Sequence, residues 1–419
     1  MRKSTFIFIV LSGLASFFNY AVYPVLARVL SADEFVDMTV ALALFTQLSS
    51  FMLSIVALTI GLSKQERERD SKQVVEKLQA ILTHLFLVII VVLLATAPLY
   101  LNRIHLPAPL LLPICAMLAL SISMSVISGF LNGQQKLVKL GISIAFSAFL
   151  QFVLSVGVAA TTKSGALTMN AMAFGSLLAI ALTYRVYRNE KLPRFSSIFT
   201  HGISLYKSKE IQSLIRFTIL ASLATLVMNI LLIADLLLVN SRETDSKIYA
   251  DTYIISRVVF FSGTLFIWPF LSNINIYKPR ESTGLFYRLA GLFSLISICA
   301  IGLMVFFGHH ITQILLGSDY GTRGDVKQLA IQAIIYKFIY LLISTLTLFF
   351  IVMRNYWAVK LPLILAATSG FALLLTPSST STVQLIVHLN IAAAVALLGG
   401  LVGYRITIRK PSKNLTSGQ

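Results

Sequence analysis

The stretch TFIFIVLSGLASFFNYAVYPVLA, residues 5–27, contains no charged side chain. A bilayer core about 30 Å thick is crossed by about 20 residues of α-helix, so this stretch is long enough to span it. It is longer than the apolar region of a signal peptide, and no small-residue cleavage site follows a short apolar run. We therefore predict that residues 5–27 form an uncleaved first transmembrane helix.

Eleven further apolar runs follow along the chain. They lie at 35–62, 76–100, 109–131, 140–161, 166–187, 214–239, 252–274, 286–308, 328–353, 357–376 and 383–404. Lipid offers the backbone no hydrogen-bond partners, so helices are the default structure for such runs. The runs are continuous and lack the short alternation of a transmembrane β-barrel. The sequence predicts an all-α integral membrane protein with about twelve transmembrane helices.

The composition agrees with a membrane protein. Hydrophobic residues make up 57% of the chain and charged residues 12%, against roughly 25% charged residues in soluble domains. A soluble enzyme is therefore excluded. The net charge of +18 is spread between the apolar runs and forms no single patch, so we expect no nucleic-acid partner. Cys115 and Cys299 lie inside apolar runs and form neither a disulfide framework nor a zinc pattern.

The distribution of Lys and Arg predicts the orientation in the membrane. If the N-terminus is cytoplasmic, 25 of the 34 basic residues fall in cytoplasmic segments and 7 in the opposite loops. Positive charge accumulates on the cytoplasmic side of membrane proteins. We therefore expect a multi-pass protein with both termini in the cytoplasm.

The longest hydrophilic stretch, Arg188–Ser213, divides the runs into two sets of six. Because each set begins on the cytoplasmic side, the halves would be parallel lobes around a central cavity that holds the substrate path. The predicted domains are an N-terminal six-helix lobe at 1–195, a cytoplasmic linker at 196–213, a C-terminal six-helix lobe at 214–404 and a basic cytoplasmic tail at 405–419.

Short segments recur in the same order on the two sides of this linker. Phe35-Val36-Asp37 recurs as Tyr249-Ala250-Asp251, and Leu137-Val138-Lys139-Leu140 recurs as Ala358-Val359-Lys360-Leu361. Asn19 and Asn229 occupy similar places in the first and seventh runs. Together these matches suggest an internal duplication.

Ionisable groups within the runs are candidate site residues, because each costs roughly 2.5–3.5 kcal/mol to insert in a membrane. Arg257 and Lys337 lie inside the eighth and tenth runs, and Arg28 ends the first. We interpret these three as cations for a phosphate. Tyr340, Asn19, Tyr23 and Asn229 are the candidates for binding sugars, and Asp235 and Asp37 are candidates for a coupling ion. We expect no catalytic residue, metal or cofactor.

Other interpretations of these polar residues remain open. Lys337 and Arg257 could extend to the membrane interface, and Asp235 could pair with Arg28 or Arg257. Hydroxyl stripes also occur, and these are often helix-packing contacts rather than ligands. The stripes are Ser121, Ser125 and Ser128; Ser143, Ser147, Gln151 and Ser155; and Thr218, Ser222, Thr225 and Asn229.

The first span and the segment after it are similar to a known sequence signature. Asn19-Tyr20, followed by Pro24-Val25-Leu26-Ala27-Arg28-Val29-Leu30-Ser31-Ala32-Asp33-Glu34-Phe35, resembles the first-span signature of bacterial polysaccharide and O-antigen (Wzx-type) flippases. These belong to the multidrug/oligosaccharidyl-lipid/polysaccharide flippase superfamily. Gly129-Phe130-Leu131-Asn132-Gly133 and the segment from Ile233 to Ala250 are also similar. Val36 stands where the family usually has glycine.

The resemblance implies a function. Such a protein would move undecaprenyl-pyrophosphate-linked oligosaccharide from the cytoplasmic to the outer leaflet of the bacterial inner membrane by alternating access. A polysaccharide polymerase and chain-length proteins would be its partners. A drug or metabolite exporter of the same superfamily is the main alternative, and a glycan polymerase or ligase is a third. The chain has no G-x-x-x-x-G-K-[ST] motif, so a P-loop ATPase is excluded.

Overall fold

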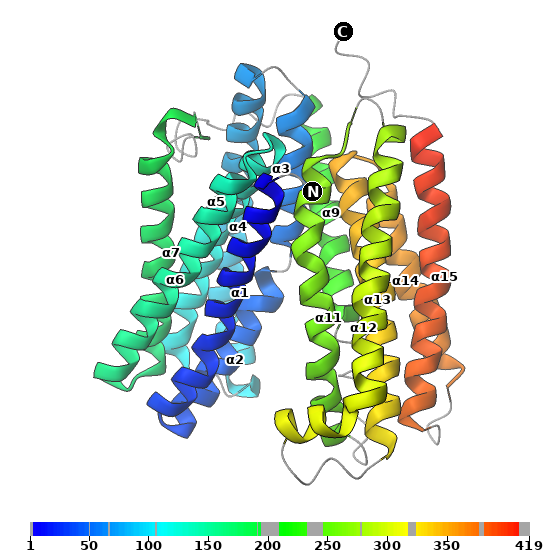
Figure 1. Ribbon diagram of the computed structural model, residues 1–419. Coiled ribbons are helices and arrows are strands. Elements are labelled where there is room, and N and C mark those ends of the chain that lie inside the picture. The colour runs from blue at the N-terminus through cyan, green and yellow to red at the C-terminus, as the bar shows by residue number, and fades with distance from the viewer. Residues whose placement is uncertain are drawn as a thin grey trace. The chain divides into compact units, whose positions relative to one another are not determined.

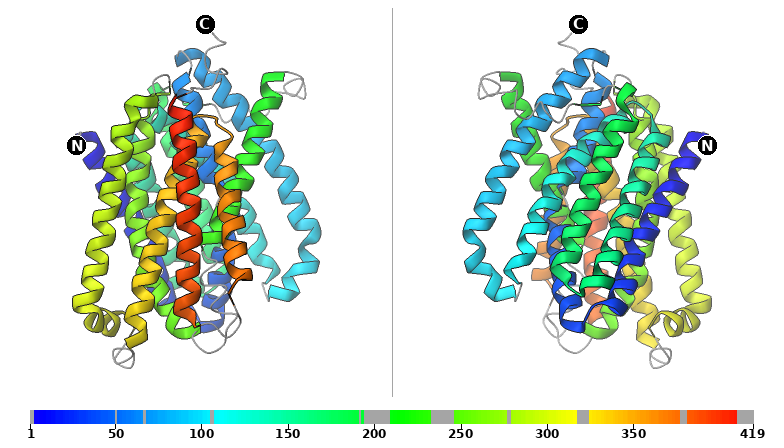
Figure 2. Two further views of the ribbon diagram at one scale, coloured as in Figure 1. Left: turned by 90° about the vertical axis from the view of Figure 1, so that its right-hand side faces the viewer. Right: turned by 90° about the vertical axis from the view of Figure 1, so that its left-hand side faces the viewer.

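The computed structural model describes residues 3–49, 51–65, 68–104, 107–190, 192–193, 209–232, 246–276, 279–316, 324–376 and 381–409. Within these ranges the chain is almost entirely helical and contains no strand. It divides into two compact units, Met1–Ser222 (unit 1) and Leu223–Gln419 (unit 2), and the division falls within one helix. In each unit the long helices run along one common direction (Figures 1 and 2).

The helices follow the predicted apolar runs closely. Those before the division are α1 (Lys3–Val29), α2 (Ala32–Ser49), α3 (Met52–Gln65), α4 (Glu68–Ile104), η1 (Ala108–Leu110), α5 (Leu111–Gly133), α6 (Leu137–Thr162), α7 (Gly165–Val186) and η2 (Arg188–Glu190). Helix α9 (Lys209–Leu232) crosses the division. It is followed by α11 (Ser246–Ser272), η4 (Pro279–Ser282), α12 (Thr283–Leu316), α13 (Gly324–Val352), α14 (Trp357–Leu374) and α15 (Thr382–Arg409).

The predicted second span is not one helix but two. Helix α2 ends at Ser49 and α3 begins at Met52. Side-chain hydroxyls compete for backbone groups here: Ser49 Oγ donates to the Thr46 carbonyl at 3.1 Å, and Ser54 Oγ donates to the Phe51 carbonyl at 2.6 Å. Such local bonds offer the backbone an alternative to the regular helix. The interruption lies within the predicted span 35–62.

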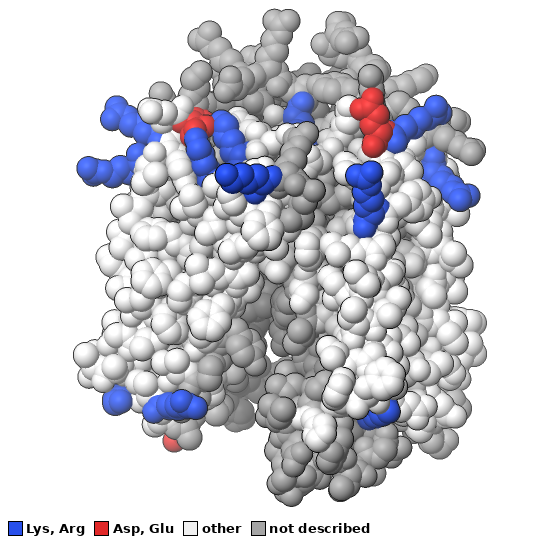
Figure 3. Space-filling view, viewed as in Figure 1, with Lys and Arg blue, Asp and Glu red and all other residues white. Residues whose placement is uncertain are grey.

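The described helices have the length and composition of membrane spans. Eight of them are long and apolar enough to cross a bilayer, and Lys3–Asn19 and Met52–Lys64 are shorter apolar helices. Large apolar side chains also remain exposed along α1 and α6, where water would be unfavourable and lipid is not. They are Phe6, Val10, Leu14 and Phe17 on α1, and Ile142, Phe146, Phe149 and Val153 on α6. In Figure 3 the basic side chains lie towards the ends of the helices, and the surface between them is uncharged.

Each unit is built around one buried helix. In unit 1, α5 packs against α2, α3, α4, α6 and α7, and in unit 2, α13 packs against α11, α12, α14 and α15. Glycine lets α5 approach α3 closely. A Cβ atom on Gly129 would lie 2.7 Å from the Val56 carbonyl oxygen, and one on Gly133 would lie 3.0 Å from that of Ile60. This Gly-x-x-x-Gly spacing is typical of tight helix contacts in membranes.

The same turn follows the buried helix of each unit. Gln135 after α5 and Arg354 after α13 both have a left-handed backbone, with φ values of 60° and 50°. In unit 1, Gln135 N donates to Asn132 O and Lys136 N to Leu131 O, both at 2.9 Å. The matching bonds in unit 2 run from Arg354 N to Ile351 O and from Asn355 N to Phe350 O, also at 2.9 Å. The shared C-terminal motif adds a structural match to the short sequence repeats.

Candidate functional site

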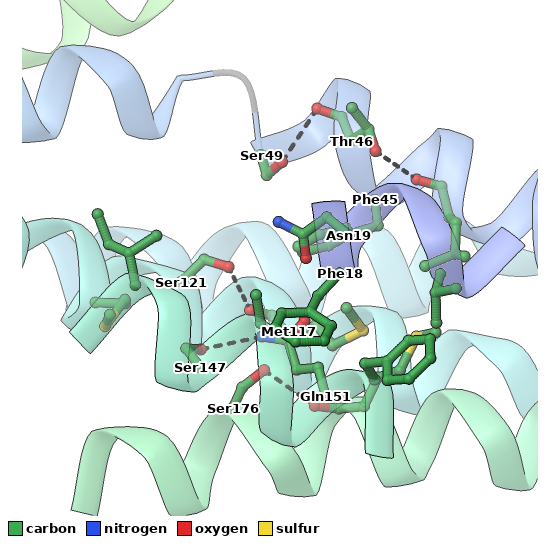
Figure 4. Close-up of a pocket in the computed structure, with 17 residues that line it drawn as sticks. Phe18, Asn19, Phe45, Thr46, Ser49, Met117, Ser121, Ser147, Gln151 and Ser176 are labelled. Carbon is green, nitrogen blue, oxygen red and sulfur yellow. Dashed lines mark hydrogen bonds between the residues drawn. The ribbon is translucent and has the colours of Figure 1, made fainter. Parts of the chain in front are cut away.

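A cavity of about 440 Å³ opens within unit 1, in the size range of small-molecule sites. Side chains from α1, α2, α5, α6 and α7 converge on it (Figure 4). Its polar lining consists of two amides and five hydroxyl groups: Asn19, Gln151, Thr46, Ser49, Ser121, Ser147 and Ser176. Its apolar lining includes three phenyl rings and three thioethers: Phe18, Phe45, Phe152, Met117, Met124 and Met172. We call this cavity the unit 1 pocket.

Several hydroxyl groups of the pocket donate their protons within their own helices. Ser121 Oγ donates to the Met117 carbonyl at 2.7 Å, Ser176 Oγ to that of Met172 at 3.0 Å, and Thr46 Oγ1 to that of Leu42 at 2.8 Å. A hydroxyl group has one proton and two lone pairs. Each of these oxygens can therefore still accept a hydrogen bond from a molecule in the pocket.

The two amides complete the polar lining. Gln151 Nε2 donates to Ser147 Oγ at 3.2 Å, which fixes the amide along α6. Asn19 is exposed to the pocket and makes no hydrogen bond to the part of the chain that the structure describes. Its amide can both donate and accept. Figure 4 shows Asn19 near Phe18 and on the same side of the pocket as Ser49.

Helix packing holds this part of α1 in place. Phe18 lies edge-on to Phe149, with ring centroids 5.3 Å apart, and tilted against Phe152 at 5.6 Å. Below the rings, Ala15 of α1 is buried against Ala145 and Ala148 of α6. Small residues allow close helix approach in a membrane. Asn19 therefore extends from a well-packed surface.

A second polar cluster lies in unit 2, where three side chains of α13 reach backbone carbonyls of α9. Lys337 Nζ donates to the Leu232 carbonyl at 2.6 Å, and the Tyr336 hydroxyl donates to that of Leu231 at 2.8 Å. The Tyr340 hydroxyl donates to the Met228 carbonyl. Each donor thus reaches a backbone carbonyl of α9. The cluster joins α13 to α9.

Lys337 is fully buried, with 0% of its side chain exposed. Its ammonium also lies over the ring of Tyr336, 5.0 Å from the centroid. The alternative in which Lys337 extends to the membrane interface is therefore wrong. Tyr340 joins Lys337 in the same cluster, as their helical spacing predicts.

The other predicted site residues lie elsewhere. Asn229 is half-buried on α9 and donates from Nδ2 to the Thr225 carbonyl at 2.8 Å. Arg28 is exposed at the end of α1, and Asp37 is half-buried on α2. The side chains of Tyr23 and Arg257, and the whole of Asp235, lie outside the described residues.

The hydroxyl stripes divide between the two interpretations. Ser121, Ser147 and Gln151 line the unit 1 pocket, together with Asn19. Ser155, in contrast, is buried in helix packing and donates to its own helix, at Phe152 O. The pocket residues Thr46, Ser49 and Ser176 were not predicted. Each is a hydroxyl residue outside the stripes, so the spacing of polar residues along one helix does not predict its place in the pocket.

Similarity to known proteins supports the fold. No protein-family profile matches the chain, and no curated protein sequence matches it. Solved structures do match. An outward-facing multidrug-resistance MATE-family transporter of the MOP superfamily has a TM-score of 0.78 at 11% identity, over 99% of this chain and 96% of that one. A MATE structure in the bent conformation has a TM-score of 0.72 at 13% identity, over 99% and 95%.

A third solved structure is a MOP-superfamily transporter from Pyrococcus furiosus, described as having a binding pocket of reverse polarity that suggests a different function. Its TM-score is 0.74 at 12% identity, over 97% of this chain and 95% of that one. At these identities the similarity establishes the fold. The chain is a multi-pass, all-helical membrane protein with the two-lobe fold of MATE transporters.

Proposed function

We propose that this protein is a flippase that moves undecaprenyl-pyrophosphate-linked oligosaccharide from the cytoplasmic to the outer leaflet by alternating access. The single observation that carries the proposal is the position of Asn19. This residue belongs to the first-span signature that resembles Wzx-type flippases, and it lines the unit 1 pocket with the amide and hydroxyl groups of four other helices. This position supports Asn19 as a residue that contacts the cargo.

The chemistry of the pocket supports a sugar as cargo. Amides and hydroxyl groups match the hydroxyl groups of a saccharide, and phenyl rings can pack on its C–H faces. A polar head group cannot cross about 30 Å of hydrocarbon unaided, while a polyprenyl tail can remain in lipid. A protected polar pocket in a membrane helix bundle meets this need.

The remaining site assignments form part of the proposal. Arg28 and Arg257 would bind the pyrophosphate, because guanidinium groups form charge-assisted bonds with phosphate oxygens. Lys337, which also donates to the Leu232 carbonyl of α9, would be the third cation for the pyrophosphate. Asp37 and Asp235 remain the candidates for a coupling ion. A polysaccharide polymerase and chain-length proteins would receive the translocated units.

A drug or metabolite exporter is the second candidate. The phenyl and thioether groups in the unit 1 pocket favour it, because aromatic and methionine side chains adapt to varied apolar ligands. The fold is also that of a multidrug-resistance transporter.

Deletion of the gene separates these functions. A flippase mutant should accumulate lipid-linked oligosaccharide that faces the cytoplasm and should be rescued by the intact gene. An exporter mutant should instead assemble its polysaccharide normally and become sensitive to a compound. Accumulation of single units that already face outward would indicate a polymerase and would contradict both transport functions.

A further inference from the structure

The unit 1 pocket is uncharged although the chain carries a net charge of +18. None of the described residues that line the pocket is Lys, Arg, His, Asp or Glu. We infer, on the basis of the proposed function, that this pocket binds uncharged sugar residues of the lipid-linked glycan and discriminates against acidic sugars. The selectivity would lie in unit 1, in side chains that do not contact the pyrophosphate.

The direction of the hydrogen bonds explains the preference for hydroxyl groups. Thr46, Ser121 and Ser176 donate to carbonyls of their own helices, so they offer lone pairs to the pocket. Sugar hydroxyl groups can donate to these oxygens. The amide of Asn19 has no described partner and can bind a sugar hydroxyl or acetamido group through both of its polar atoms.

The same arrangement disfavours a carboxylate. An ionised group loses its hydration when it enters a pocket between membrane helices, and this cost is offset only by a partner of opposite charge or by strong donors. The pocket has no described cation, and the protons of three hydroxyl groups are directed into the helix backbones. A uronic acid would therefore find no cation among the described lining residues, only the amides of Asn19 and Gln151 and the Ser147 hydroxyl as neutral donors.

The helix interruption lies beside the pocket. Helix α2 ends at Ser49, which lines the pocket. Carbonyl groups in the last turn of a helix lack partners within the helix, and interrupted helices form the binding sites of many transporters. On the apolar side, Phe18, Phe45 and Phe152 provide flat surfaces for the sugar rings.

Binding to the full-length protein in lipid nanodiscs tests this inference. The probes are undecaprenyl pyrophosphate without sugar, the same lipid with N,N′-diacetylchitobiose, and the same lipid with a disaccharide that contains glucuronic acid. We expect the neutral disaccharide to raise affinity about tenfold over the sugarless lipid, the effect of one or two hydrogen bonds. The acidic disaccharide should give no increase.

Substitutions assign the effect to the pocket. Asn19→Ala and Gln151→Ala should each remove most of the gain from the neutral disaccharide, without changing the affinity for the sugarless lipid. Gln151→Lys should reverse the preference and favour the acidic disaccharide. Thr161→Ala is the matched control, because Thr161 is an exposed residue of the same helix, α6, and bonds only within it.

The outcomes separate this inference from the proposed function. Equal gains from neutral and acidic disaccharides, or full gains in both alanine variants, would overturn the inference and leave the flippase proposal standing. If none of the three lipids binds, the flippase proposal fails. Free N,N′-diacetylchitobiose then tests the pocket: binding that Asn19→Ala weakens supports a neutral-sugar site, and absence of binding overturns it.

Discussion

The ammonium of Lys337 donates a hydrogen bond of 2.6 Å to the backbone carbonyl of Leu232 on α9. A fully buried Lys thus joins α13 to α9 by a charge-assisted bond. The assignment of Lys337 to the substrate phosphate stays a prediction. The contact with Leu232 indicates in addition that Lys337 positions α9.

Replacement of Lys337 by Met should lower the stability of the protein as well as its transport activity. The change leaves the Leu232 carbonyl without its charged donor, at a cost of about 1.5–3 kcal/mol. Thermal unfolding in detergent would measure the loss. Lys337→Arg should retain more stability than Lys337→Met, because it keeps a charged donor.

Lys327→Met is the matched control for Lys337→Met. Lys327 Nζ donates to the Val305 carbonyl at 2.7 Å, but its side chain is exposed, so this variant should change stability little. Loss of transport by Lys337→Met with an unchanged unfolding temperature would contradict the positioning role and favour direct contact with substrate.

Gly129→Ala should destabilise unit 1. The new Cβ would lie 2.6 Å from the Thr59 Cβ and 2.7 Å from the Val56 carbonyl oxygen, so α3 and α5 would have to separate. Overpacking of this kind costs roughly 1–3 kcal/mol, and the unfolding temperature in detergent should fall. Gly157→Ala in α6 is the control: its Cβ would meet nothing within 4 Å, so unfolding should be unchanged. Equal effects of the two changes would show that the α3–α5 contact can relax.

The left-handed turns should tolerate glycine and resist β-branched residues. Gln135→Val and Arg354→Val place a β-branched side chain at φ values of 60° and 50°. The left-handed conformation destabilises residues other than glycine by about 1–2 kcal/mol. A β-branched side chain adds to this strain. We expect lower unfolding temperatures for both valine variants than for Gln135→Gly and Arg354→Gly. Similar values for valine and glycine would indicate that the turns can adopt another conformation.

Glu190→Gln should have a small, salt-dependent effect. Glu190 joins Lys136, at 2.5 Å, and Lys139, at the turn between α5 and α6. Both lysines are partly exposed, so each pair contributes at most about 1 kcal/mol. The unfolding temperature of Glu190→Gln should approach that of the unchanged protein as salt is raised. A difference that persists at high salt would show that the carboxylate acts by packing rather than by charge.

Apolar length was sufficient to predict the order and approximate positions of the helices, although α4 begins at Glu68 rather than 76 and α12 ends at Leu316 rather than 308. The run 140–161, for example, became α6 at Leu137–Thr162. The interruption after Ser49 was not predicted, because neither glycine nor proline marks it and hydroxyl groups are common inside membrane helices. The pocket was predicted only in part. Periodicity places Ser147 and Gln151 on one face of a helix, but it does not reveal which face of α2 or α7 lies opposite.

The hydrogen-bond partner of Lys337 could not be predicted for a different reason. Its depth in the run and its shared face with Tyr340 are visible in the sequence. Its partner is a backbone carbonyl, and every residue has one. Side-chain identity therefore carries no sign of a contact with Leu232, and the phosphate assignment of Lys337 stays a prediction.

The glycines of α5 also limit how the unit 1 pocket can change size. One wall of the pocket comes from Met117, Ser121 and Met124 on this helix. Two turns further along α5, Gly129 and Gly133 contact α3. Because glycine has no side chain, no flexible group separates the two helices there. Rotation or sliding of α5 would drive Thr59 and Ser63 into its main chain. A larger ligand would therefore need α1, α2, α6 or α7 to move away, or α3 and α5 to move together as one pair.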